Sequence, residues 1–176
     1  MSEPMRIMTI GHSTHAAAHF VDLLEAHGVT AVADVRLMPA SRRHPHFSRA
    51  ALESLLATHG VAYQHFAALG GHRRPLPDSP NSGWRHPSFR GYADHMRSPE
   101  FRDALETLLT FSQKFLAAVM CAESQWWRCH RQLIADALIV RGIEVRHIMA
   151  LNRAPVHELT PFARVDGFDL RYPDLL

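Results

Sequence analysis

The sequence predicts a single α/β domain with a mostly parallel sheet of about five strands and flanking helices. Two observations predict this fold. From residue 6 to residue 148, short apolar segments alternate with segments whose apolar residues recur at helical spacing. The short segments are apolar at nearly every position, as expected of strands that are covered on both faces. A chain of 176 residues is long enough for one such domain with a sizeable core.

The first half of the chain contains three expected strands and two expected helices. The strands are residues 6–10, 30–35 and 61–66. The first helix, within residues 15–27, has Phe20, Leu23 and Leu24 on one face and Gly28 as its C-cap. The second begins at Ser48, carries an apolar face that includes Leu52 and Leu56, and ends at Gly60.

Residues 69–92 differ from the rest of the chain. They contain four glycines, four prolines and four arginines against one acid, Asp78, with Trp84 and Phe89 between the arginines. A loop of this length inside one domain is usually functional or disordered. We interpret this basic loop as a lid.

The second half continues the alternation. Ser98, Pro99 and Glu100 predict a helix start, because they supply an N-cap, a proline at N1 and a first-turn acid. The strand within residues 114–121 is the most hydrophobic stretch of the chain, and a helix over 130–141 and a strand over 144–148 follow. We expect residues 151–176 to be loop with short irregular elements. No linker divides the chain, so residues 1–176 form one domain.

Composition excludes several classes of protein. The net charge of +2 argues against a nonspecific nucleic-acid coat. No apolar run approaches the roughly 18 residues that span a bilayer, and the N-terminal residues lack a signal-peptide core. We therefore expect a cytoplasmic protein without membrane contact. Two cysteines make no disulfide framework, and in a reducing compartment they are free thiols or ligands.

Polar residues follow several of the expected strands. His12 and Ser13 come after the first strand, Asp34 and Arg36 end the second, and Cys121 and Glu123 end the fourth. The next helix starts with Cys129, His130 and Arg131. Because ligands bind beyond the carboxyl ends of parallel strands, we expect these groups to share one edge of the sheet.

The start of that last helix favours anions. Free backbone N–H groups and the helix dipole attract negative charge, and Arg131 adds a guanidinium for phosphate or carboxylate. The same field favours the thiolate of Cys129, whereas Cys121 has the strand-end position. Each cysteine is otherwise a small buried hydrophobe. Glu123 is a candidate general acid or base, with a salt bridge to Arg131 or Arg36 as the alternative.

Other known motifs are absent. A Cys-x5-Arg phosphatase loop, a P-loop and a GxGxxG motif do not occur. Cys121, Cys129 and His130 could bind zinc together with His12 or a carboxylate, although the spacing is not that of a zinc ribbon or knuckle. Trp126 and Trp127 stand between the two cysteines, where they stack on a ligand or pack on the core.

Several motifs together resemble the DUF488 family over about residues 6–150. They are residues 9–13 (TIGHS), 34–36 (DVR) with Pro39 and Ser41, 69–71 (LGG), 121–123 (CAE), 129–131 (CHR) and 142–148. The resemblance implies a single-domain α/β fold. It assigns no catalytic residue, so the site residues rest on the chemistry of the side chains.

We expect an enzyme that acts on a phosphorylated or nucleotide-like small molecule at residues 121–131. The expected catalytic residues are Glu123, Cys129, Cys121 and His130. The expected residues for binding the substrate or anion are His12, Ser13, Asp34, Arg36, Arg131, Arg73 and Arg74. No pattern identifies a cofactor or the oligomeric state.

Two alternatives remain open. The first is a nucleic-acid-associated binding module, in which Arg42, Arg43 and the arginines of the basic loop contact phosphates and Trp84 stacks on a base. The second is a metal-dependent or redox protein.

Overall fold

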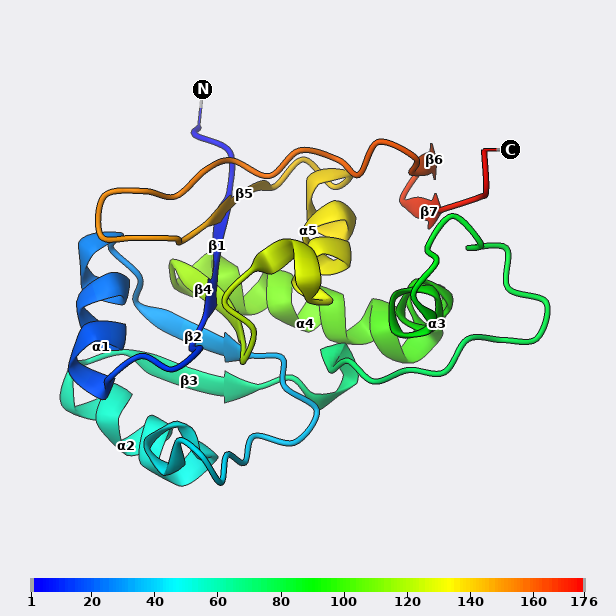
Figure 1. Ribbon diagram of the computed structural model, residues 1–176. Coiled ribbons are helices and arrows are strands. Elements are labelled where there is room, and N and C mark those ends of the chain that lie inside the picture. The colour runs from blue at the N-terminus through cyan, green and yellow to red at the C-terminus, as the bar shows by residue number, and fades with distance from the viewer. Residues whose placement is uncertain (1, 176) are drawn as a thin grey trace.

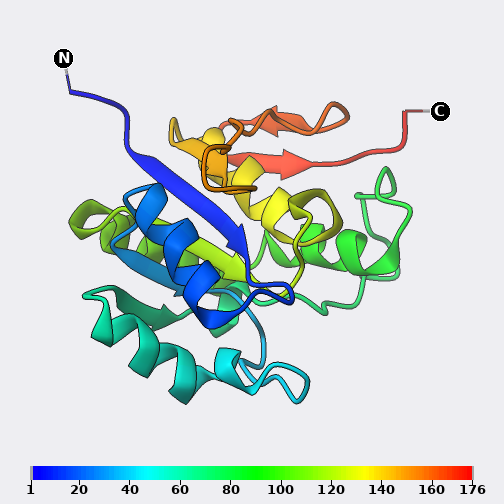
Figure 2. The same ribbon diagram turned by 60° about the vertical axis from the view of Figure 1, so that its left-hand side comes forward.

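A computed structural model describes residues 2–175 and contains a five-stranded sheet, all parallel, with helices on both faces (Figure 1). The strand order is β3-β2-β4-β1-β5. The strands are β1 (Arg6–Gly11), β2 (Ala31–Asp34), β3 (Ala62–His65), β4 (Ala117–Cys121) and β5 (Glu144–His147). Figure 2 shows the arrows of the neighbouring strands β1 and β4 pointing the same way. The predicted α/β fold is therefore confirmed.

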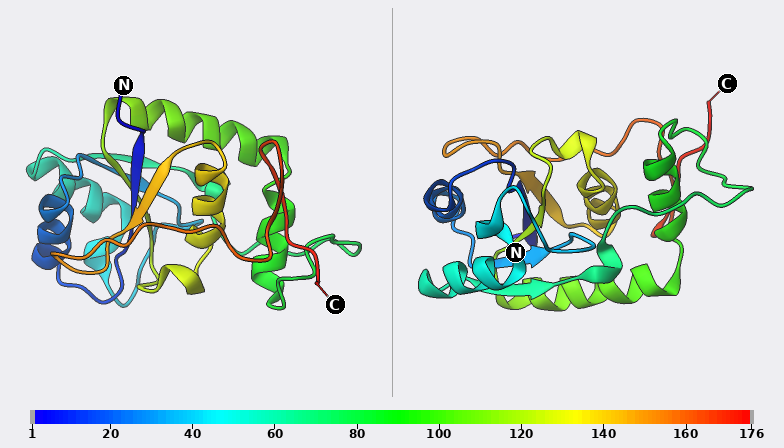
Figure 3. Two further views of the ribbon diagram at one scale, coloured as in Figure 1. Left: turned by 90° about the horizontal axis from the view of Figure 1, so that it is seen from above. Right: turned by 60° about the horizontal axis from the view of Figure 1, so that its bottom comes forward.

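The helices form one layer on each face of the sheet. They are α1 (Ala17–Ala26), α2 (Arg49–Thr58), α3 (Pro87–His95), α4 (Pro99–Lys114) and α5 (Arg131–Ile139). Alternate strand residues supply the two cores: Met8 and Ile10 pack with α1 and α2, whereas Ile7 packs with the other three helices. Figure 3 shows α1 and α4 on opposite sides of the sheet.

Helix ends follow the capping residues of the sequence. The hydroxyl of Ser98 accepts a hydrogen bond of 3.1 Å from the Phe101 N–H, as expected of an N-cap before Pro99. Gly28, Gly60 and Gly142 follow the ends of three helices with φ of 70°, 70° and 80°. This left-handed conformation is the reason for glycine there. No helix within residues 2–175 is both long and apolar enough to cross a bilayer.

The expectation of a loop over residues 69–92 is wrong from Pro87 onward, where α3 begins. Pro87 stands at the helix start, and the His86 ring accepts a hydrogen bond of 3.2 Å from the Ser88 N–H. Gly91 lies inside this helix because a Cβ there would lie 2.0 Å from the Arg73 carbonyl oxygen. The glycine that indicates a loop in the sequence serves close packing instead.

The rest of the basic loop is fixed to α3 by a buried carboxylate. Asp94 accepts hydrogen bonds from the Asn81 amide (2.7 Å), the Ser79 hydroxyl (2.7 Å) and the Leu76 N–H (2.8 Å). Trp84 stacks on Phe89, with ring centroids 5.1 Å apart, rather than standing free. The C-terminal tail adds a hairpin, β6 (Arg164–Asp166) and β7 (Asp169–Arg171), beside α3 (Figures 1 and 3).

Candidate active site

The ends of β1, β2 and β4 meet at one edge of the sheet, as the parallel arrangement predicts. The His12 N–H donates to the Cys121 carbonyl (2.9 Å) and the Ser13 N–H donates to the Ala122 carbonyl (3.0 Å). A Cβ on Gly11 would lie 1.9 Å from the Glu123 carbonyl oxygen. Only glycine therefore lets the loop after β4 pack this closely against the end of β1.

A pocket of about 840 Å³ opens at this edge. Six of the predicted site residues line it: His12, Arg36, Cys121, Glu123, Cys129 and His130. Apolar and aromatic side chains form much of the remaining wall, including Met38, Phe89, Tyr92 and Trp127. Arg128, His72 and His86 add basic groups. The volume and lining suit a small molecule that combines a ring with an anionic group.

The two cysteines form a close pair at the inner end of the pocket. Their sulfurs are 2.7 Å apart, and their residues are only 2% and 8% exposed. Burial, together with the hydrogen bond to Cys129, raises the pKa of Cys121 well above its usual value. Burial also opposes ionisation of Cys129, but the Cys121 thiol and the charge and N–H groups of Arg131 lower the pKa of Cys129 to about 7. Near neutral pH the thiolate of Cys129 is substantially populated, and Cys121 is its hydrogen-bond donor.

Arg131 is buried behind this pair and does not line the pocket. Its residue is 1% exposed, and its Nε donates to the Cys121 sulfur over 3.0 Å. Its other N–H groups donate to Thr9 Oγ1 (3.1 Å) and to the Glu123 carbonyl (2.6 Å). No carboxylate within residues 2–175 forms an ion pair with Arg131. The anion closest to this guanidinium is therefore the cysteine pair itself, rather than a ligand in the pocket.

His130 lies beside Cys129. Its Nε2 lies 2.9 Å from the Val35 carbonyl, which only a protonated nitrogen can contact favourably, so Nδ1 is the free lone pair. That Nδ1 lies 3.4 Å from the Cys129 sulfur. Burial lowers the pKa of His130, so the ring is a weak base that accepts a hydrogen bond from the Cys129 thiol. Cys121 and Arg131, rather than this ring, lower the pKa of Cys129.

Asp34 and Arg36 bind each other. Two hydrogen bonds of 2.9 and 2.7 Å join the guanidinium to the carboxylate, and Tyr63 donates to the same carboxylate over 2.5 Å. Arg36 also donates to the Phe47 carbonyl over 2.7 Å. The pair shapes the pocket wall, and Asp34 itself does not line it.

The remaining predicted residues lie outside the pocket lining. Ser13 has a φ of 46° and forms the turn after β1. Arg73 donates to the Gly70 carbonyl over 3.1 Å, and Arg74 is exposed to solvent. In the described part of the chain, no three His, Cys, Asp or Glu side chains gather as metal ligands.

A buried chain of hydrogen bonds runs from Arg131 away from the pocket. Thr9 Oγ1 lies 2.6 Å from His147 Nδ1, His147 Nε2 lies 2.9 Å from His157 Nδ1, and His157 Nε2 lies 2.7 Å from Asp136 Oδ1. One tautomer of each ring gives a continuous series: Arg131 donates to Thr9, Thr9 to His147, His147 to His157 and His157 to Asp136. Each of these groups then has a hydrogen-bond partner. The chain therefore joins a buried cation to a buried carboxylate.

The sequence does not predict this series of hydrogen bonds. Asp136 is a carboxylate within the apolar run of the helix over 130–141, and a buried carboxylate requires partners. That signal was available in the sequence. Its partners His147 and His157 could not be identified, because β5 and the C-terminal tail supply them from distant positions.

Acid is expected to destabilise the protein from about pH 6.5 downward. Burial is the main cause that lowers the pKa of His147 to about 2 and the pKa of His12 to about 4, and the positive charge of Arg131 contributes at His147. Below pH 6.5 these histidines bind protons in the unfolded chain but not in the folded protein. The free energy of unfolding therefore decreases as the pH is lowered. Each ring contributes about 1.4 kcal/mol per pH unit until its folded-state pKa is reached.

Urea denaturation at several pH values between 7 and 5 measures this slope. His12→Gln is expected to flatten it, because one of the rings with a lowered pKa is gone. A free energy of unfolding that stays constant over this interval would contradict the burial of neutral histidines.

Comparison with known proteins finds one family. Residues 16–138 match the family described as Domain of unknown function DUF488. No curated protein and no solved structure matches the chain.

Proposed function

The chain belongs to the DUF488 family, and we propose that it is an enzyme whose Cys129 thiolate attacks a phosphorylated or nucleotide-like small molecule. The observation that carries this proposal is the buried Arg131 guanidinium, which contacts the cysteine pair and no carboxylate within residues 2–175. An arginine is always protonated, so burying it without a carboxylate is costly unless another anion balances it. A thiolate on Cys129 supplies that anion and is a strong nucleophile.

The pocket supports the assignment of roles. The sulfur forms a bond to the electrophilic centre of the substrate as the bond to the leaving group breaks. Glu123, which lines the same pocket, is assigned to proton transfer: it gives a proton to the leaving group and takes one from the water that releases the bound intermediate. Arg128 favours an anionic substrate, and Phe89 and Trp127 favour one with a ring.

A screen of phosphorylated and nucleotide compounds tests this proposal with three proteins. The unchanged protein is expected to turn over at least one compound, Cys129→Ser none, and Glu123→Gln none while binding of that compound is kept. With a compound whose leaving group departs without a proton, mass spectrometry is expected to find a substrate fragment attached to Cys129 in the Glu123→Gln protein, because release of the fragment still needs the proton transfer. Turnover that survives Cys129→Ser would remove the thiolate from the mechanism.

The distance of 2.7 Å between the two sulfurs favours a second candidate, thiol–disulfide exchange. The Cys129 thiolate would attack a substrate disulfide, and the Cys121 proton would leave with the first thiol. The Cys121 sulfur would then displace the second thiol and close a bond to Cys129. Two electrons pass to the substrate, and the protein keeps one disulfide.

Oxidised glutathione tests this candidate. It is expected to produce a protein that is lighter by two hydrogens, with a peptide that links Cys121 and Cys129, and dithiothreitol is expected to reverse the change. A stable mixed disulfide between Cys129 and glutathione would show that Cys121 does not complete the exchange.

A further inference from the structure

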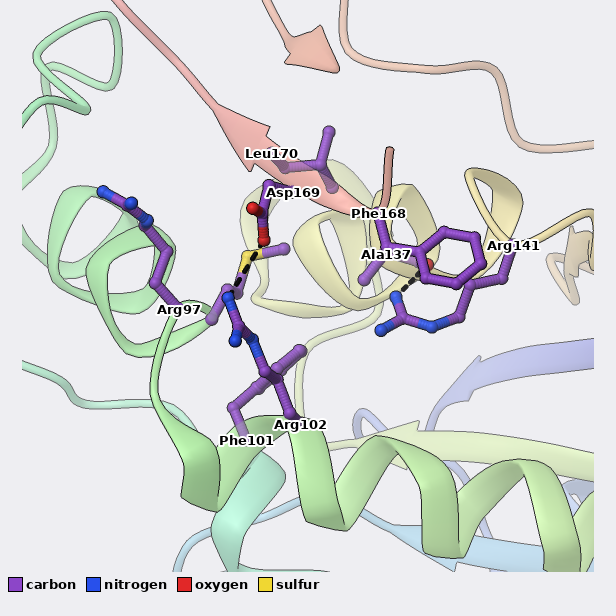
Figure 4. A pocket seen from close by; sticks show the side chains of 9 residues that line it. Arg97, Phe101, Arg102, Ala137, Arg141, Phe168, Asp169 and Leu170 are labelled. Carbon is purple, nitrogen blue, oxygen red and sulfur yellow. Dashed lines mark hydrogen bonds and ion pairs between the residues drawn. The ribbon is translucent and has the colours of Figure 1, made fainter. Parts of the chain in front are cut away.

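A second hollow lies between α4, α5 and the β6–β7 hairpin. Its volume is about 320 Å³, and none of the residues that line it lines the cysteine pocket. Arg97, Arg102 and Arg141 all line it, and Figure 4 shows Arg102 between the other two, with the exposed Arg97 side chain directed outward and Phe168 beside Arg141. Arg97 lies in the turn between α3 and α4, Arg102 in α4, and Arg141 just after α5. Three separate parts of the chain thus each place an arginine at the wall or rim of this hollow.

The hollow has an excess of positive charge. Asp169 is the only carboxylate among its lining residues, and it forms one ion pair with Arg102, at 3.0 Å, in which both side chains are about half exposed. The Arg97 guanidinium makes no hydrogen bond or ion pair with any part of residues 2–175. The lining therefore holds three cations and one carboxylate, and a bound anion would reduce the repulsion among the cations.

Arg141 has the strongest need of a partner. Its side chain is 13% exposed, and its Glu106 contact spans 3.9 Å to a carboxylate that is largely in solvent. One Nη group donates to the Ala137 carbonyl over 3.1 Å, whereas the buried Nε has no hydrogen-bond partner in the described chain. Buried N–H groups are rarely left unpaired, and a nearby anion offsets part of that cost.

Phe168 adds an aromatic surface at the rim. It stands in the turn between β6 and β7, and its residue is 63% exposed. The Arg141 guanidinium carbon lies 4.8 Å from the ring centroid, which fixes the ring beside the cations. A planar group can stack on the part of the ring that faces solvent.

We propose that this hollow binds a phosphate group attached to a planar ring. Arg102 and Arg141 contact the phosphate oxygens, the exposed Arg97 side chain turns inward to join them, and Phe168 stacks on the ring. A free nucleotide and one nucleotide unit of a single-stranded nucleic acid share this chemistry. The site is independent of the cysteine chemistry, since it uses none of the same residues.

Calorimetric titration of the full chain with AMP, inorganic phosphate and a short oligothymidylate tests the site. Arg97→Gln and Arg102→Gln are each expected to weaken AMP binding roughly tenfold or more, because each removes a charge-assisted contact. Arg153→Gln removes one equally exposed arginine elsewhere and is expected to bind like the unchanged protein. Phe168→Ala is expected to weaken AMP and leave inorganic phosphate unaffected. Cys129→Ser is expected to bind AMP normally, which separates this site from the proposed enzyme.

Comparison of the probes identifies the source of the phosphate. If oligothymidylate binds much more tightly than AMP, with a steep dependence on salt, the ligand is single-stranded nucleic acid. If the two bind alike, it is a free nucleotide. Absence of binding for both probes up to millimolar concentration would overturn the proposal. Equal losses for Arg97→Gln and Arg153→Gln would overturn it as well, because binding would then follow net charge alone.

Discussion

Replacing Arg131 with methionine is expected to remove the reactive thiolate and to destabilise the protein by about 3–5 kcal/mol. Methionine fills a similar apolar space but supplies no N–H group. The Glu123 carbonyl and the Thr9 hydroxyl each lose a buried donor, and the cysteine pair loses its cation. Burial then dominates the ionisation of Cys129 and raises the pKa of its thiol above that of an ordinary cysteine.

The rate of iodoacetamide alkylation as a function of pH reports this change, and urea denaturation reports the stability. In the unchanged protein the rate is expected to rise with a midpoint near 7, set by Cys129. In Arg131→Met the rate at neutral pH is expected to fall roughly tenfold or more, since only the thiolate reacts. Arg153→Met removes an exposed arginine that does not line the pocket, so it is the matched control and should alter neither quantity much. An unchanged midpoint in Arg131→Met would mean that the guanidinium does not stabilise the thiolate.

The position of Arg131 explains why the anion-binding interpretation of the sequence needed revision. A helix start with Cys-His-Arg predicts that a bound anion lies there. The anion closest to the guanidinium, however, belongs to the protein, because Arg131 points back toward Cys121 and Thr9. Sequence spacing does not reveal the direction of a long side chain, and the choice between pocket and interior depends on the tertiary packing.

The parts of the fold that depend on periodicity were predictable. The five strands and four of the five helices follow from apolar spacing and from caps such as Ser98 and Gly142. Helix α3 was missed because Gly91 and Pro87 are typical of loops, while their actual roles are close packing and a helix start. The parallel topology alone predicts that the strand ends share one edge of the sheet. His12, Arg36, Cys121 and Cys129 do line one pocket there.

The sequence does not predict features to which distant segments contribute. The Asp136 chain takes Thr9 from β1, His147 from β5 and His157 from the tail. The arginine hollow takes Phe168 from a hairpin where irregular loop was expected. In both cases the partners have no fixed sequence separation, so only the packed structure shows that they meet.

Asp136 is the other residue whose loss is expected to have a large effect. Its carboxylate accepts hydrogen bonds from His157 Nε2 (2.7 Å), the Tyr172 hydroxyl (2.8 Å) and the Thr160 N–H (3.1 Å). Asp136→Leu leaves all three donors buried and unpaired, and we expect it to cost about 3–5 kcal/mol. For a chain of this length, that is a fall in melting temperature of roughly 10 °C or more.

Asp136→Asn separates the hydrogen bonds from the charge. An amide can still accept from His157 and Thr160 and can donate to the Tyr172 oxygen, so we expect a loss well below that of Asp136→Leu. Asp103→Leu on the exposed side of α4 is the matched control, and it should change the free energy of unfolding by no more than about 0.5 kcal/mol. Thermal and urea denaturation of the three variants measure these differences. If Asp136→Leu were as stable as Asp103→Leu, the chain from Arg131 to Asp136 would not contribute to the fold, because its anionic end would be dispensable. If Asp136→Asn were as damaging as Asp136→Leu, the negative charge opposite Arg131, rather than the three hydrogen bonds, would be what stabilises it.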